Sequence, residues 1–181
     1  MHNQTIHFTL NDVSITCTVP PHWSLHDALR TVDAAAERPD PCPAGDCCRC
    51  TVLLDGRAVC ACHVLAHEAA DRTVRTRGGL TGHLVLQALL ALDGPCGSCI
   101  DAFALAVIDH LGACSDEVGT CVSTGAPPDP QCRPGMGWLR AEFHAERRLE
   151  AGLRAIPCTC DIEPQVRQIV RRLMHSRRLI P

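Results

Sequence analysis

Apolar and polar residues follow two different patterns along this 181-residue chain, and the change comes near Gly78-Gly79. Before these glycines, short runs alternate between apolar and polar residues and end at turn residues, which is the pattern of β-strands. Beyond them, apolar residues recur about every 3.6 positions, which is the period of an α-helix. The pattern therefore predicts an α+β protein, with a sheet-forming domain over residues 1–78 and a helical domain over residues 79–181.

The first domain opens with two strands and a helix. Residues 5–19 contain the runs TIHFTL and SITCTV, and Asn11-Asp12 between them suits a hairpin turn. Ser24, followed three residues later by Asp27, has the spacing of a capping box. We therefore expect a helix that begins at Ser24, runs to about residue 36 and covers the sheet.

A cysteine-rich loop and a second hairpin follow. Residues 39–49, PDPCPAGDCCR, are mostly structure-breaking residues and cysteines, so they are predicted to form a loop. The runs TVLL and RAVCAC then have the pattern of two strands around a turn at Asp55-Gly56, with Cys60 and Cys62 on the second strand. A last strand is predicted near residues 73–76.

The helical domain has an irregular middle. Helical periodicity is found in residues 84–90 and 100–111, and helices are predicted again near residues 138–155 and 164–175. Residues 112–137, GACSDEVGTCVSTGAPPDPQCRPGMG, have no period. They are predicted to form a long irregular insertion, of a kind that is often functional.

Cysteine is the unusual feature of the composition, because 14 cysteines occur beside 3% aromatic residues and no Tyr. Disulfide-rich secreted domains are usually shorter than about 80 residues and follow a signal peptide. Residues 1–10 contain no basic segment followed by an apolar run, and no apolar stretch is long enough to span a membrane. We therefore expect a cytoplasmic protein whose reduced thiols bind metal.

Charge argues against two classes of partner. The formal net charge of −3 provides no basic surface for nucleic acid. The chain also has no basic amphipathic stripe that would favour a membrane surface.

The first group of thiols is a loop motif. Cys42, Cys47 and Cys50 have the C-x4-C-x2-C spacing of plant-type [2Fe–2S] ferredoxins, which need one further cysteine downstream. Small loop residues such as Gly45 let backbone N–H groups approach the cluster sulfurs. The residues alone leave two candidates for the fourth ligand, Cys60 and Cys62.

The second group of thiols is split between two motifs, Cys96-x2-Cys99 and Cys158-x-Cys160. Cys96 and Cys99 lie near the start of a predicted helix, where the helix dipole and free N–H groups favour thiolates. Together the two motifs would make one four-thiolate site, for an iron–sulfur cluster or for structural zinc.

These motifs, in this order, resemble the small iron–sulfur subunit of the molybdenum hydroxylases, the family of xanthine dehydrogenase, aldehyde oxidoreductase and aerobic carbon monoxide dehydrogenase. That family has C-x4-C-G-x-C-x11-C, then C-G-x-C, then C-x-C. This chain has CPAGDCCRCTVLLDGRAVCAC, PCGSC and PCTC, and the match covers nearly its whole length. The x11 interval after Cys50 ends at Cys62, so the resemblance selects Cys62 over Cys60 as fourth ligand.

The resemblance implies a β-grasp, ferredoxin-like domain with one [2Fe–2S] cluster, followed by a four-helix domain with a second. It implies an electron-transfer subunit of an oxidoreductase with no substrate-converting site of its own. This subunit would relay electrons from a molybdopterin site in a large partner subunit to FAD in another partner. The eight implied metal ligands are Cys42, Cys47, Cys50, Cys62, Cys96, Cys99, Cys158 and Cys160.

The chain also departs from the family pattern, mostly around the second cluster. Cys48 stands in place of Gly and Pro95 in place of Gln, while CIDAF and CTCDIE replace CTPGM and CRCTGY. Two alternatives stand beside the implied function, and these departures motivate the first of them. One is the same two-cluster relay in a molybdenum-free oxidoreductase, and the other is a non-catalytic metal-binding or redox-sensing module.

The remaining cysteines and the histidines are given no ligand role. Cys17 is expected to be a small buried hydrophobe, and Cys60 a thiol close to the first cluster. The ten histidines form no catalytic arrangement and are expected at the surface or with satisfied hydrogen bonds. Three thiols of the predicted insertion have two interpretations. They bind an added metal or cluster with His110, His144 or a partner residue, or they are free thiols packed against a partner or joined in a disulfide; they are Cys114, Cys121 and Cys132.

Overall fold

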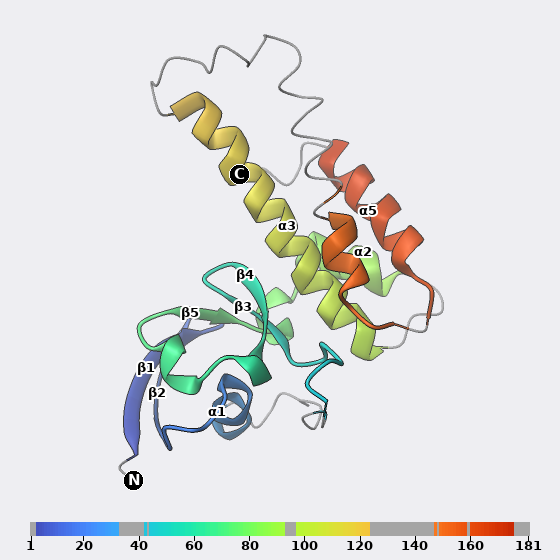
Figure 1. The fold of residues 1–181 in the computed structure, drawn as a ribbon. Helices are drawn as coiled ribbons and strands as arrows, with labels where there is room; N and C mark the ends of the chain where they lie inside the picture. Colours follow the sequence, from blue (N-terminus) through green and yellow to red (C-terminus); the bar gives the residue numbers. More distant parts are fainter. Residues whose placement is uncertain are drawn as a thin grey trace.

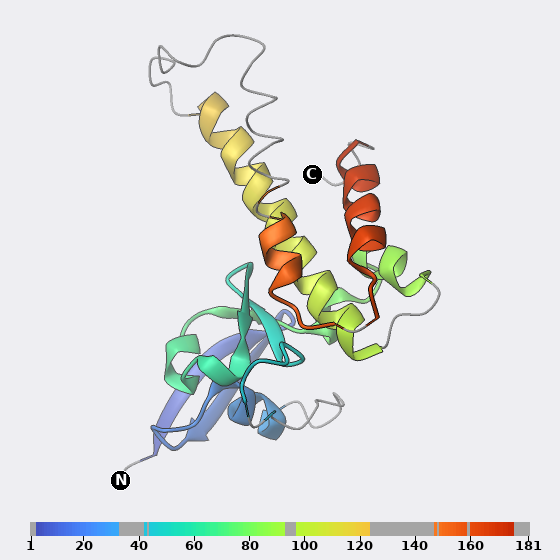
Figure 2. The ribbon, with the colours of Figure 1, turned by 45° about the vertical axis from the view of Figure 1, so that its right-hand side comes forward.

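The computed structural model describes residues 3–32, 42, 44–92, 97–123, 147, 149–158 and 160–175. The described residues up to 80, here called the sheet half, form a five-stranded sheet with the order β2-β1-β5-β3-β4. The described residues from 84 onward, the helical half, lie beside it (Figures 1 and 2). The strands are β1 (Gln4–Leu10), β2 (Val13–Val19), β3 (Thr51–Leu54), β4 (Arg57–Cys60) and β5 (Thr73–Arg75).

Two tight turns fix the antiparallel hairpins of the sheet. Asn11 and Asp12 join β1 to β2 with φ angles of 49° and 68°, and Asp55 and Gly56 join β3 to β4 with 49° and 81°. Positive φ at both central residues defines the type I′ turn, whose twist matches that of the flanking strands. Both hairpins predicted from the sequence are confirmed.

The capping box at the start of α1 (Leu25–Val32) is present. The Asp27 N–H donates to Ser24 Oγ over 3.2 Å, and the Ser24 N–H donates to Asp27 Oδ2 over 3.0 Å. These bonds satisfy backbone donors that a helix start leaves without partners. The predicted start of the helix is confirmed, and the predicted extension over residues 33–36 lies outside the described residues.

Strand β3 separates two hydrophobic cores. Val52 and Leu54 pack with Leu29 of α1 in the core of the sheet half, whereas Leu53 packs with Phe103 in the core of the helical half. Successive side chains of a strand point to opposite faces, so both faces of β3 are covered. This explains why the run TVLL is continuously apolar and does not alternate.

The helical half contains α2 (Leu84–Leu90), α3 (Gly97–Ser123), α5 (Glu163–His175) and a helical segment over residues 149–154. Their apolar faces meet in one core that also includes Leu80. Two ion pairs tie α3 to the sheet half, from Arg57 to Asp109 over 3.2 Å and from Arg77 to Asp101 over 3.0 Å. Within the described segments, no helix has both the length and the hydropathy needed to cross a membrane.

The irregular insertion predicted over residues 112–137 is wrong in its first part. Helix α3 continues past Gly112 to Ser123, and residues 124–137 lie outside the described residues. A single Gly inside a helix costs only about 1 kcal/mol, and no Pro occurs between Gly97 and Pro127 to stop the helix. Gly112 and Gly119 therefore lie inside the helix. Because they interrupt the apolar pattern, the helical period of this segment is not visible in the sequence.

Candidate metal centres

Cys50 and Cys62 are in contact, with 3.4 Å between their Sγ atoms. Cys50 is buried at the end of the loop that leads into β3. Beyond β4, residues Ala61–His63 form one turn of 3-10 helix, and the Ala61 N–H donates to the Cys50 carbonyl oxygen over 3.2 Å. This turn carries Cys62 back to Cys50.

The prediction that Cys60 and Cys62 both lie on the second strand of the hairpin is wrong for Cys62. Strand β4 ends at Cys60, which pairs with Thr51, the first residue of β3. Beyond this pair the partner strand has turned into the loop, so the chain closes into the 3-10 turn. Strand alternation therefore does not place the two thiols on one face; the turn does the positioning.

Cys42 and Cys47 form a second pair in the same loop. The N–H and thiol of Cys47, followed by the N–H groups of Asp46 and Gly45, hydrogen-bond to the Cys42 sulfur and hold its pKa below the usual value. Consecutive N–H groups turned toward a sulfur also stabilise the negative charge of a bound cluster. The loop thus suits a metal-bound thiolate at Cys42.

Gly45 permits this loop conformation. Its φ is +70°, and a Cβ there would lie 2.6 Å from His63 Nε2. Because His63 belongs to the turn that carries Cys62, this close approach brings together the two segments that hold the first group of thiols. A residue with a side chain here would require the His63 ring to shift and would also adopt an unfavourable φ.

The two thiols of the Cys50–Cys62 pair have pKa values shifted in opposite directions. A hydrogen bond from the Cys60 thiol, with further ones from Cys62, lowers the pKa of Cys50 to about 5 against the opposing effect of burial. Burial, and then the hydrogen bond to Cys50, raises the pKa of Cys62 to about 12. Metals bind the thiolate form, so metal binding here would displace the proton from Cys62.

Cys60 also lies beside a thiol that sequence reasoning gave no role. The Sγ atoms of Cys60 and Cys48 are 3.8 Å apart, and Cys48 Sγ lies 3.6 Å from the carbonyl oxygen of Ala155 in the helical half. The expectation that Cys60 lies close to the first group of thiols is confirmed by its hydrogen bond to Cys50.

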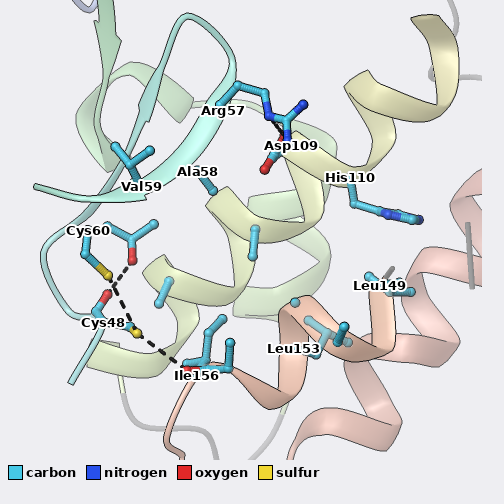
Figure 3. Close-up of a pocket in the computed structure, with 16 residues that line it drawn as sticks. Cys48, Arg57, Ala58, Val59, Cys60, Asp109, His110, Leu149, Leu153 and Ile156 are labelled. Atoms are coloured by element: carbon cyan, nitrogen blue, oxygen red, sulfur yellow. Dashed lines mark hydrogen bonds and ion pairs between the residues drawn. The ribbon is translucent and has the colours of Figure 1, made fainter. Parts of the chain in front are cut away.

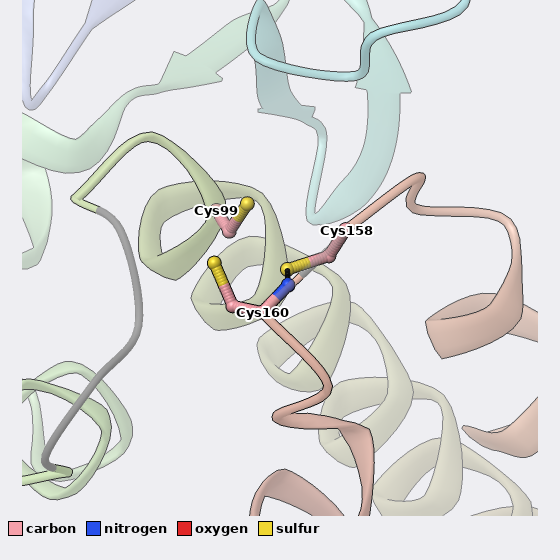
Figure 4. A group of neighbouring side chains, drawn as sticks. All are labelled: Cys99, Cys158 and Cys160. Atoms are coloured by element: carbon pink, nitrogen blue, oxygen red, sulfur yellow. Dashed lines mark hydrogen bonds between the residues drawn. The ribbon is translucent and has the colours of Figure 1, made fainter.

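The second group of thiols gathers from two distant segments. The sulfurs of Cys99, Cys158 and Cys160 all lie within 4.8 Å of one another (Figure 4), and the Cys160 N–H donates to Cys158 Sγ over 3.4 Å. Cys99 lies in the first turn of α3, while the other two lie on the link that leads into α5. Cys96, the predicted fourth member, lies outside the described residues.

His26 differs from the expectation for histidines. It is 1% exposed, and neither ring nitrogen has a hydrogen-bond partner among the residues that the structure describes. Its ring lies close enough to Cys50 to be one of the smaller causes of the lowered pKa of that thiol. The sequence signal that could have predicted this burial is the position of His26 in α1, between Leu25 and Ala28 on the buried face of the helix.

The residues proposed for an added metal are only partly described. Cys114 and Cys121 lie seven residues apart on α3, so their backbones are separated by about 10 Å along the helix axis. His110 is buried on the same helix, whereas Cys132 and His144 lie outside the described residues.

Curated relatives match the sequence over much of its length. The nicotinate dehydrogenase small FeS subunit of Eubacterium barkeri is 29% identical over 133 residues, which cover 69% of this chain and 85% of the relative. The xanthine dehydrogenase iron-sulfur-binding subunit of Escherichia coli O157:H7 is 31% identical over 114 residues, which cover 59% of this chain and 70% of the relative. No family model matches the chain.

Solved structures match the fold over nearly the whole chain. The aldehyde oxidoreductase from Desulfovibrio gigas has a TM-score of 0.68 and 19% identity; the match covers 97% of this chain but only 18% of that much longer one. A chain of quinoline 2-oxidoreductase from Pseudomonas putida 86 has a TM-score of 0.52 and 26% identity, with 95% of this chain and 98% of that chain covered. Together with the sequence matches and the gathered thiols, these likenesses identify the chain as a member of the family of iron–sulfur electron-transfer subunits of the molybdenum hydroxylases.

Proposed function

We propose that this chain holds two [2Fe–2S] clusters and relays electrons within a multi-subunit molybdenum hydroxylase. The observation that carries the proposal is the gathering of two separate groups of thiols, one in the sheet half and one in the helical half. The proposed ligands are Cys42, Cys47, Cys50 and Cys62 for the first cluster, and Cys96, Cys99, Cys158 and Cys160 for the second.

The chemistry of the donors fits this assignment. In a [2Fe–2S] cluster four thiolates bind two irons, two to each. The first group is arranged as two contacting pairs, Cys42 with Cys47 and Cys50 with Cys62. Among the described residues, only Cys99, Cys158 and Cys160 form a set of three donors that all lie within 4.8 Å of one another. Paired donors favour a two-iron cluster over one tetrahedral zinc ion at the first site.

The position of the first group also suits a buried electron carrier. Cys50 is 7% exposed and packs in the core of the sheet half, which shields this side of the site from water. Cys48, next to Cys47, contacts Ala155, which is three residues before Cys158 of the second group. The two sites are therefore linked by a short path that crosses the contact between Cys48 and Ala155.

We further propose two domains, a β-grasp domain over residues 1–78 and a four-helix domain over residues 79–181. The strand order with α1 packed on the sheet supports the first, and the shared core of the described helices supports the second.

The partners would be a large molybdopterin-binding subunit and an FAD-binding subunit. When bound, the clusters would pass single electrons from molybdenum through the helical-domain cluster and the β-grasp cluster to FAD. This chain would have no substrate-converting site of its own.

The test is metal analysis and EPR of the complex purified through this subunit. Four irons per chain and two distinct rhombic signals after reduction with dithionite are expected. A single species of one spin per chain would refute the two-cluster assignment, and zinc without iron would refute the electron-transfer function. Copurification of FAD and molybdenum would support the proposed partners, whereas a complex without molybdenum would refute this part of the proposal.

A further inference from the structure

Two thiols outside the proposed ligand sets face each other at the junction of the two halves. Cys48 Sγ and Cys60 Sγ are 3.8 Å apart (Figure 3). Both line a cavity of about 410 Å³ enclosed by β4, α3 and the segment around residues 149–156. This cavity gives a small molecule access to both sulfurs.

The backbone holds the two thiols in this arrangement. The N–H and hydroxyl of Thr51 both donate to the Cys48 carbonyl oxygen, over 3.1 and 2.5 Å, and Thr51 is the strand partner of Cys60. Cys48 has a φ of +54°, a conformation that is unfavourable for residues with a side chain. Backbone strain of this kind persists only where the surrounding structure enforces it, and it occurs often at functional sites.

We propose that Cys48 and Cys60 form a reversible disulfide, with a small-molecule disulfide as the oxidant. A disulfide has an S–S distance of about 2.05 Å, so the sulfurs must approach each other by less than about 2 Å, which side-chain rotation can provide. The proposal rests on the ligand assignment above, which leaves both thiols free.

The disulfide forms by thiol–disulfide exchange, in two successive substitutions at sulfur. In the first, Cys48 Sγ forms a bond to one sulfur of the small disulfide, whose S–S bond breaks, and the released thiol takes up the proton from Cys48. In the second, Cys60 Sγ attacks the Cys48 sulfur, the mixed disulfide breaks, and a second small thiol leaves with the proton from Cys60. Two protein thiols are oxidised, and one small disulfide is reduced to two thiols.

Closing this bond would change the contacts of both thiols, including that of Cys48 Sγ with the Asp46 carbonyl oxygen. Cys60, whose thiol donates to Cys48 Sγ, would lose this proton, and the neighbouring Cys50, a proposed ligand of the first cluster, would lose a thiol donor that lowers its pKa. Hydrogen bonds to cluster sulfurs help to set the reduction potential, and their loss disfavours the more negative reduced cluster. Cys48 would lose its contact with the Ala155 carbonyl oxygen. The disulfide would therefore lower the potential of the first cluster and leave the second one unchanged.

The experiment treats the iron-loaded protein with hydroxyethyl disulfide and maps its disulfides by mass spectrometry. A Cys48–Cys60 link is expected while the cluster absorbance is retained. EPR-monitored redox titration should then give a lower potential for the first signal only, and a dithiol reductant should reverse the shift. The inference would be overturned if both thiols could still be alkylated after treatment. It would also be overturned if the link formed only as cluster absorbance was lost. An unchanged potential in the linked protein would overturn its effect on the cluster.

Matched variants separate this inference from the proposed function. Cys48→Ser and Cys60→Ser should each abolish the link and the shift while keeping all the iron, and Cys17→Ser, on strand β2, should leave the link intact. Loss of iron from Cys60→Ser would mark Cys60 as a ligand and refute the inference. Wild-type protein without iron would refute the proposed function, whereas iron-loaded protein without the link would refute only the inference.

Discussion

Cys50 Sγ lies 3.4 Å from Cys62 Sγ, and the hydrogen bond from the Ala61 N–H to the Cys50 carbonyl oxygen holds the two segments together. We predict that Cys62→Ser removes the first cluster, and with it about half of the iron, because this cluster needs all four thiolates. Iron per chain and the EPR signals of the reduced protein measure the effect.

Cys60→Ser is the matched control, since the Cys60 thiol also hydrogen-bonds to Cys50 but is not a proposed ligand. This variant should keep its full iron content. The reverse pattern, with iron lost from Cys60→Ser and kept by Cys62→Ser, would exchange the roles of the two residues.

The second group of thiols makes an independent prediction. Cys160→Ser should abolish one of the two EPR signals and remove about half of the iron, because it leaves three of the four thiolates. The remaining signal should match the one that Cys62→Ser removes. A variant that keeps both signals would show that Cys160, despite its closeness to Cys99 and Cys158, is not a ligand.

Two glycines with positive φ allow backbone strain to be separated from steric contact. Gly45→Ala should weaken the first site, because φ is +70° and the new Cβ would lie 2.6 Å from His63 Nε2. Gly56 has a φ of +81° with nothing within 4 Å of an added Cβ. Gly56→Ala should therefore cost only the backbone strain, about 1 kcal/mol.

Iron content and thermal unfolding of the two glycine variants check this prediction. Gly45→Ala should lose iron from the first site and unfold at a lower temperature than Gly56→Ala, which should keep its iron. Equal iron content and equal melting temperatures in both variants would mean that His63 moves aside at no cost, so that the approach of Gly45 does not shape the site.

Local signals in the sequence predict local structure well here. Asn11-Asp12 and Asp55-Gly56 form the expected turns, because few residues tolerate two successive positive φ angles. Ser24 and Asp27 form the expected capping box, because its bonds join residues only three apart. Such features depend on neighbours in the chain and need no knowledge of tertiary structure.

Tertiary packing decides the features that the sequence does not reveal. The burial of His26 depends on what packs against α1. The continuation of α3 past Gly112 has a different origin, because a single Gly is only a weak helix breaker. The spacing C-x4-C-x2-C locates the loop, but only the turn at Ala61–His63 explains how Cys62 reaches Cys50 while Cys60 meets Cys48.

Asp55 should make part of the stability of the sheet half depend on pH. The Thr73 N–H donates to Asp55 Oδ1 over 2.8 Å, and Arg72 Nε donates to Oδ2 over 2.5 Å. The hydrogen bond from Thr73, and after it the one from Arg72, lower the pKa of Asp55 below its ordinary value. The stabilisation is therefore fully present above the unfolded pKa and is lost as the pH falls through the lower folded pKa.

Asp55→Asn should remove this pH-dependent contribution while keeping the turn, because Asn also accepts the left-handed conformation that precedes Gly56. Asp55 is partly exposed, so after solvent screening we expect a loss of only about 0.5 kcal/mol near neutral pH and none in strong acid. Urea unfolding of wild type and variant at both pH values measures the difference. Arg72→Gln is the control and should keep most of the pH dependence, since the Thr73 N–H bond remains. A variant Asp55→Asn whose stability differs from wild type equally at both pH values would contradict the prediction.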